Sequence, residues 1–160
     1  MQSADLRRGR RVLIVPIANP DGYANHTRGN ANGVDLNRNF AAGNWANRRV
    51  NGPARRSEPE SRAIERLIVA ERPARIVSIH QPLECVDYDG PGAPLARIMS
   101  EACGLPVRKL GARPGSLGSW AGLERGVPVI TLELPGSAGR LDREALWRRY
   151  GAALIEAIAY

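Results

Sequence analysis

Two ionisable residues occur where predicted strands end, in positions that could carry acid–base or metal chemistry. His80 directly follows the apolar run 74–79, and Glu133 lies between Leu132 and Leu134 near the end of another such run. A carboxylate that is buried without a partner costs several kcal/mol or titrates at a higher pH, so Glu133 needs a cation or a metal-bound water nearby. His80 fits either a metal ligand or a core histidine whose nitrogens are satisfied by its neighbours.

Asn37 and Arg38 form an adjacent pair of amide and guanidinium groups within the segment 33–40. The planar guanidinium of arginine donates two parallel hydrogen bonds to a carboxylate. In open α/β sheets, ligands bind at the carboxyl ends of the strands, where His80 and Glu133 are predicted to lie. The four residues together could therefore bind the carboxylate end of a substrate.

The elements that would position these residues alternate between strands and helices. Short runs of β-branched and apolar residues predict strands at 11–18, 74–79 and 127–134, with a weaker candidate at 105–110. Apolar periodicity predicts helices at 57–72, where Ser57 and Glu60 would form a capping box, and at 93–102, 120–124 and 141–159. This order predicts an α/β fold with a mixed, largely parallel sheet flanked by helices.

Composition limits the class of protein. The 160 residues fit one domain, and a hydrophobic content of 43% with 24% charged residues is that of a globular chain rather than a disordered one. No run approaches the roughly 18 apolar residues of a membrane span. The first residues lack the apolar stretch of a secretory signal, so we expect a cytoplasmic protein.

The net charge of +7 raises nucleic acid as a partner, but the pattern of basic residues argues against it. Of the 23 basic residues only Lys109 is a lysine, and the arginines are scattered rather than gathered in one stripe. Such an arginine bias is typical of GC-rich codons. Cys85 and Cys103 are isolated and are expected to be buried or idle thiols.

Five motifs resemble, in content and order, those of the zinc carboxypeptidase family. They are N-P-D-G-Y at 19–23, Arg28, G-V-D-L-N-R-N-F at 33–40, S-I-H at 78–80 and T-L-E-L-P at 131–135. With S-E-P-E, H-Q-P-L and P-G-S-L-G-S-W, they most resemble the bacterial murein peptide amidases, cytoplasmic members that cleave γ-D-glutamyl-diaminopimelate in recycled cell-wall peptides. The resemblance implies a carboxypeptidase-like fold of the phosphorylase/hydrolase type in a single domain, 1–160.

The resemblance also implies a role for each matching residue. His80 would be a zinc ligand, Glu133 the general base acting on the zinc-bound water, and Arg28 the group that polarises the scissile carbonyl. Asn37 and Arg38 would hold the terminal carboxylate of the substrate. Zinc lowers the pKa of bound water to about 7, and a buried glutamate can then take its proton. The implied cofactor is Zn²⁺, and the implied partner is a small peptide with a free carboxylate, without nucleic acid or membrane.

The family's other two zinc ligands come from an H-x-x-E motif that precedes the strand predicted at 11–18, and the sequence before that strand does not contain it. A substitute site built from His26 or Glu84 is not expected, because Pro82 keeps His80 and Glu84 from sharing a helical face. We therefore expect a fold lacking its N-terminal strands and two zinc ligands. Its exposed apolar sheet surface would favour self-association.

Three interpretations remain open from the sequence. The chain could be the C-terminal part of a working amidase, or a metal-free relative that binds peptides ending in a carboxylate without cleaving them. It could also be a deacylase similar to aspartoacylase and succinylglutamate desuccinylase. The N-P-D-G and L-N-R-N-F motifs favour the peptidases over the deacylases.

Overall fold

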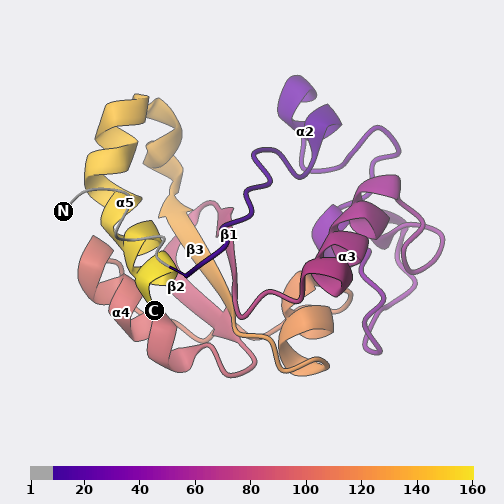
Figure 1. The fold of residues 1–160 in the computed structure, drawn as a ribbon. Helices are drawn as coiled ribbons and strands as arrows, with labels where there is room; N and C mark the ends of the chain where they lie inside the picture. The colour runs from indigo at the N-terminus through magenta and orange to yellow at the C-terminus, as the bar shows by residue number, and fades with distance from the viewer. Residues whose placement is uncertain (1–8) are drawn as a thin grey trace.

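The computed structural model describes residues 9–160 and has a three-stranded mixed sheet at its centre. Strand β3 (Val129–Pro135) lies in the middle, parallel to β1 (Ile76–His80) on one side and antiparallel to β2 (Leu83–Asp89) on the other. Figure 1 shows α4 and α5 on one side of the sheet, with α3 and residues 118–123 on the other side. The predicted α/β fold, with a mixed sheet between helices, is confirmed.

The α-helices are α2 (Pro20–Asn25), α3 (Pro59–Glu71), α4 (Ala93–Cys103) and α5 (Arg143–Ala159), with short helical turns η1 (Leu36–Arg38), η2 (Arg49–Asn51), η3 (Gly118–Leu123) and η4 (Gly136–Arg140). Helices α3, α4 and α5 match the predicted periods with small shifts at their ends, whereas α2 was not predicted. Gly104 directly follows the last residue of α4, and its φ of 74° suits a residue without a Cβ. Helix α5 begins after Asp142, whose side chain accepts a hydrogen bond from the Ala145 N–H.

The capping box predicted for α3 is wrong. The helix begins at Pro59 with Glu58 in the capping position, and Ser57 lies one residue too early. The Ser57 hydroxyl donates to the Glu58 carboxylate at 2.6 Å instead of accepting from the helix backbone. Glu58 is buried, and its backbone N–H donates to the Asn39 side-chain oxygen at 3.0 Å, which ties the start of the helix to the preceding loop.

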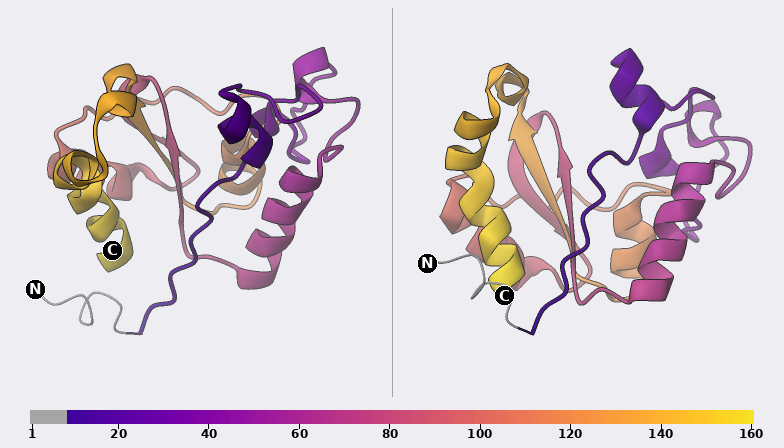
Figure 2. Two further views of the ribbon diagram at one scale, coloured as in Figure 1. Left: turned by 90° about the horizontal axis from the view of Figure 1, so that it is seen from above. Right: turned by 45° about the horizontal axis from the view of Figure 1, so that its top comes forward.

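Residues 11–18 do not form the buried strand that their composition predicts. They run as extended chain beside the outer edge of β1, as the two views of Figure 2 show, without pairing with it. Their side chains are exposed, with Ile14 78% accessible. A continuous run of apolar residues is typical of a strand that is buried on both faces. Residues 9–160 contain no layer that covers this run, so no gain from apolar burial offsets the entropy lost when a strand pairs.

Two further strand predictions need correction. Residues 105–110 form only an isolated bridge between Val107 and Val86 rather than a strand. Residues 83–89 form β2, which the sequence did not predict, because three acidic residues break its apolar pattern. The strand gains its stability from pairing with β3 along its whole length, a long-range contact that local composition does not report.

The sheet is covered on both faces by separate apolar clusters. One cluster joins β2 and β3 to α4 and α5 through buried residues such as Val86, Leu95, Met99, Ile130 and Leu132. The other packs Phe40 and Trp120 against the opposite side, with their ring centroids 6.0 Å apart.

None of the helices within residues 9–160 has the length and apolar character needed to cross a bilayer.

Candidate active site

His80 and Glu133 lie side by side at the carboxyl ends of the parallel strands β1 and β3, where they are register partners. Glu133 is only 8% exposed, and its Oε2 has no hydrogen-bond partner among residues 9–160. Both residues line a cavity of about 260 Å³. Burial lowers the pKa of His80, which favours the neutral imidazole, while the carboxylate of Glu133 acts in the opposite direction.

Asn37 and Arg38 reach the same cavity from the turn η1. The turn is held by Asp35, which accepts a hydrogen bond from the Asn37 N–H at 3.0 Å. The Asn37 side-chain oxygen accepts from the Leu117 N–H at 2.9 Å, so the amide is fixed with its NH₂ group left as a donor. Arg38 is half-buried and donates to the Asn37 carbonyl at 2.5 Å. The pair is therefore a rigid set of donors.

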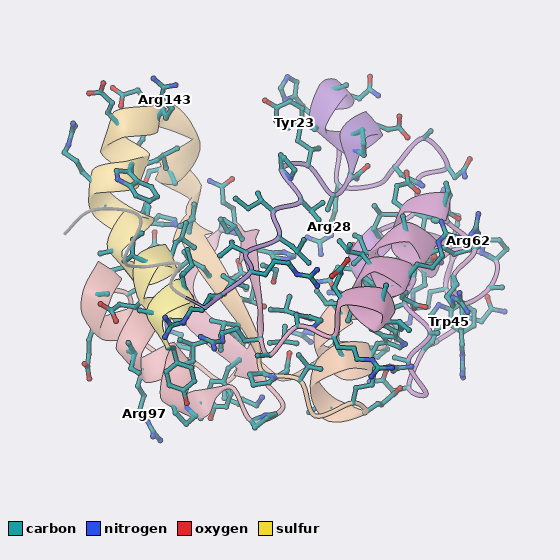
Figure 3. All side chains as sticks on the ribbon, viewed as in Figure 1. Tyr23, Arg28, Trp45, Arg62, Arg97 and Arg143 are labelled. Atoms are coloured by element: carbon teal, nitrogen blue, oxygen red, sulfur yellow. The ribbon has the colours of Figure 1, made fainter. Side chains whose placement is uncertain are left out.

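Arg28 also lines the cavity, although its side chain is largely exposed. Its Nε donates to the Asp35 carboxylate at 2.7 Å, so Asp35 orients both Arg28 and the turn that carries Asn37. Figure 3 shows Arg28 between the sheet and the half of the molecule that contains α3. All five residues predicted for the site thus line one cavity, although they are up to 105 positions apart in the sequence.

The N-P-D-G motif positions Arg28 rather than entering the cavity itself. Asn19 caps α2 by accepting from the Gly22 N–H at 2.9 Å, and its amide donates to the Arg28 carbonyl at 3.2 Å. A Cβ at Gly22 would overlap the Asn19 side chain, so only glycine fits there. The motif directly follows the run predicted as a strand at 11–18, but within residues 9–160 no strand precedes it.

Sequence reasoning missed three acidic residues of the site. Asp35 belongs to the motif at 33–40, but its role is to orient Arg28, and only the fold brings these two side chains into contact. Asp87 and Asp89 line the cavity from β2, where Asp87 accepts from the Leu110 N–H at 2.9 Å and Asp89 pairs with Lys109 at 3.1 Å. Burial raises the pKa of Asp87, and the charge of Asp89 adds to this effect. The D-Y-D alternation was the available signal for both.

The described residues do not complete a zinc site. Within residues 9–160 no three side chains of His, Cys, Asp or Glu come together as metal ligands. His80 could supply one ligand, and the Glu133 oxygen that lacks a partner in this range could accept from a water bound to the metal. Zinc enzymes normally bind the metal through three protein ligands. His26 is exposed at the end of α2 and Glu84 is exposed on β2, so neither forms a substitute site with His80.

Comparison with known proteins gives a consistent family. The profile of the zinc carboxypeptidase family matches residues 2–88. Murein peptide amidase A of Escherichia coli (strain K12) is 40% identical over 144 residues, which cover 79% of this chain and 59% of that protein. Murein peptide amidase A of Vibrio campbellii is 37% identical over 149 residues, covering 82% and 59%. The chain therefore spans about 59% of the length of these relatives.

Solved structures agree with the fold. The crystal structure of murein-tripeptide amidase from Escherichia coli O157 superposes with a TM-score of 0.75 at 33% identity, over 90% of this chain and 65% of that one. Bovine thrombin-activatable fibrinolysis inhibitor, at 21% identity and a TM-score of 0.65, shares the fold over 90% of this chain and 65% of its own. On its motifs, its fold and these matches, the chain belongs to the zinc carboxypeptidase family.

Proposed function

We propose that this chain forms the substrate-binding and proton-transfer part of a zinc-dependent hydrolase that cleaves a peptide or γ-D-glutamyl amide bond beside a free carboxylate. The observation that carries the proposal is the convergence of His80, Glu133, Arg28, Asn37 and Arg38 on one cavity at the carboxyl ends of β1 and β3. Glu133 is a buried carboxylate with an oxygen that no group in residues 9–160 hydrogen-bonds, and it lies beside three cationic or amide donors, which suits amide hydrolysis better than simple packing.

Each residue has a distinct task in this proposal. Glu133 takes a proton from the attacking water and gives it to the leaving amine, because its Oε2 is buried and free to accept. Arg28, held by Asp35, stabilises the negative charge that develops on the carbonyl oxygen, and such a donor typically contributes about 3–4 kcal/mol. Asn37 and Arg38 bind the carboxylate beside the scissile bond and fix its position.

Zinc, when bound in this family, polarises the carbonyl and acidifies the attacking water. Residues 9–160 bring only His80 into position as its ligand, so the two remaining ligands are proposed to come from outside this range. A relative that binds peptides without cleaving them is the second candidate, and the missing group of three ligands is the observation that favours it. Both candidates use the same carboxylate-binding pair.

The proposed substrate is a murein peptide containing γ-D-glutamyl-diaminopimelate, acted on in the cytoplasm. The names of the murein peptide amidases that resemble the chain support this substrate. Membrane and nucleic acid are not proposed as partners. Fractionation of cells that produce the protein, followed by blotting, tests the location.

The decisive experiment is hydrolysis by the longest protein read in frame through this sequence. Release of diaminopimelate from L-alanyl-γ-D-glutamyl-diaminopimelate should require zinc and should fall about 100-fold or more in Glu133→Gln. Glu144→Gln, which removes an exposed carboxylate from α5, is the matched control and should retain full activity. Full activity of Glu133→Gln, or faster cleavage of an N-acyl amino acid, would overturn the proposal, and the second result would support the deacylase.

A further inference from the structure

We propose that Arg113 is a specificity residue of this cavity and binds a second carboxylate on the terminal residue of the substrate. This inference rests on the proposed function, because it concerns the same bound peptide. Arg113 lies in the loop between Val107 and η3, and it lines the cavity with Arg28 and Arg38.

The three guanidinium groups differ in what they already bind. Arg28 donates to the Asp35 carboxylate, and Arg38 donates to the Asn37 carbonyl. Within residues 9–160 the Arg113 side chain forms no ion pair and no hydrogen bond, and the residue is exposed at the rim of the cavity that it lines. A guanidinium that lines a cavity without an acceptor of its own is well placed to bind an anion from outside.

Repulsion among the three guanidinium groups also favours the binding of an anionic ligand. Burial lowers the pKa of Arg38, and the charges of both Arg28 and Arg113 lower it further, whereas Asp35 acts against this. The cavity therefore brings three guanidinium groups together, and although Asp87, Asp89 and Glu133 also line it, Asp35 is the carboxylate that pairs with one of the three, Arg28. A ligand with two carboxylates relieves this repulsion more fully than a ligand with one, because each carboxylate neutralises a different guanidinium.

The backbone at Arg113 is held by hydrogen bonds, so the position of its Cα relative to the cavity is defined. The Arg113 carbonyl accepts from the Ser116 N–H at 3.0 Å and from the Ser119 hydroxyl at 2.8 Å. Two residues on, Gly115 packs so closely on the Arg38 carbonyl that a Cβ has no room. The loop that carries Arg113 is thus anchored beside the turn that carries Arg38, so the two guanidinium groups can act on one terminal residue.

The test uses two peptides that differ in a single carboxylate. Lysine is diaminopimelate without its distal carboxylate, so γ-D-glutamyl-lysine is the matched control for γ-D-glutamyl-diaminopimelate. Titration calorimetry of the 160-residue chain should show the diaminopimelate peptide binding roughly fivefold more tightly. Arg113→Ala should remove this preference by weakening only the diaminopimelate peptide, and Arg113→Lys should restore part of it. Arg38→Ala should weaken both peptides.

Arg97→Ala removes one positive charge from α4, away from the cavity lining, and should leave the preference unchanged. The proposal is overturned if the wild-type chain binds both peptides equally or binds neither, or if Arg113→Ala weakens both by the same factor. It is also overturned if Arg97→Ala matches the effect of Arg113→Ala. If the wild-type chain shows no preference, or Arg113→Ala keeps it, while the longer protein still releases diaminopimelate, only the role of Arg113 is overturned. If the 160-residue chain prefers the diaminopimelate peptide but the longer protein does not hydrolyse it, only the proposed function is overturned.

Discussion

His80 and Glu133 are register partners on the parallel strands β1 and β3, so a histidine and a buried carboxylate meet at one edge of the sheet. On the opposite edge of β3, Glu133 also faces Cys85 of β2. The Oε2 of Glu133, which has no hydrogen-bond partner among residues 9–160, is the feature of this pair least explained by packing.

Zinc should bind the 160-residue chain weakly, with a dissociation constant above about 1 μM, because His80 is the one ligand that residues 9–160 position. The chain alone should also show little peptidase activity. Titration calorimetry measures the affinity, and His80→Ala should remove the remaining binding. His26→Ala changes the other histidine, which is exposed at the end of α2, and should have no effect. Tight one-to-one binding or full hydrolytic activity would contradict this prediction.

Asn39→Ala should lower the free energy of unfolding by about 2–4 kcal/mol, since it removes several buried hydrogen bonds at once. The Asn39 amide donates to the carbonyls of Asn51 and Ala54 and to the Ser57 hydroxyl, and its oxygen accepts from the Glu58 N–H. These bonds close the long polar loop that precedes α3. Urea unfolding followed by circular dichroism gives the measurement.

The matched control for Asn39 is Asn25→Ala, in which an exposed asparagine of α2 loses a single bond to the Asp21 carbonyl. It should change the free energy of unfolding by less than about 1 kcal/mol. An equal loss in both variants would show that the buried network around Asn39 does not hold the loop. Peptide binding should weaken in Asn39→Ala as well, because the same loop carries Arg38.

Asp87→Asn should stabilise the protein at pH 7. Burial raises the pKa of Asp87 in the folded state, so the stability it contributes is present below its unfolded pKa and is lost as the pH rises through the folded pKa. Asparagine keeps the oxygen that accepts from the Leu110 N–H and carries no charge at any pH. The gain should disappear below about pH 3, where the wild-type carboxyl is protonated in both states.

Thermal unfolding measured from pH 3 to pH 8 checks the Asp87 prediction. Asp87→Ala removes the same charge and also the acceptor for the Leu110 N–H, so it should gain less than Asp87→Asn. A wild-type protein more stable than Asp87→Asn at pH 7 would mean that the carboxylate is stabilised by its surroundings rather than penalised by burial.

Self-association is expected from the uncovered apolar surface beside β1. Ile14 is 78% exposed in the extended run, and an apolar groove of about 840 Å³ between the sheet and α5 is lined by Ile79 and by Trp147, which is 57% exposed. Light scattering should give a mass above the 17.4 kDa of one chain, falling toward it in Ile14→Lys. Val69→Lys changes another exposed apolar residue, on α3, and should not alter the mass. A stable monomer of the wild-type chain would refute this expectation.

The sequence by itself determined the elements whose signals are local. Local sequence was enough to predict three elements: α4 with Gly104 after it, β1 and β3. An apolar period and a helix cap depend only on neighbours within a few residues. The motifs likewise named His80, Glu133, Arg28, Asn37 and Arg38, which the fold then brought to one cavity.

Only the tertiary structure decided the features that depend on partners distant in the chain. Strand β2, with Asp87 and Asp89, forms because β3 pairs with it, and Asp35 becomes part of the site because Arg28 lies next to it. The run 11–18 has the composition of a buried strand and stays exposed, since residues 9–160 do not cover it. The physical reason is the same in each case: burial and pairing are properties of two surfaces, and one segment of sequence describes only one of them.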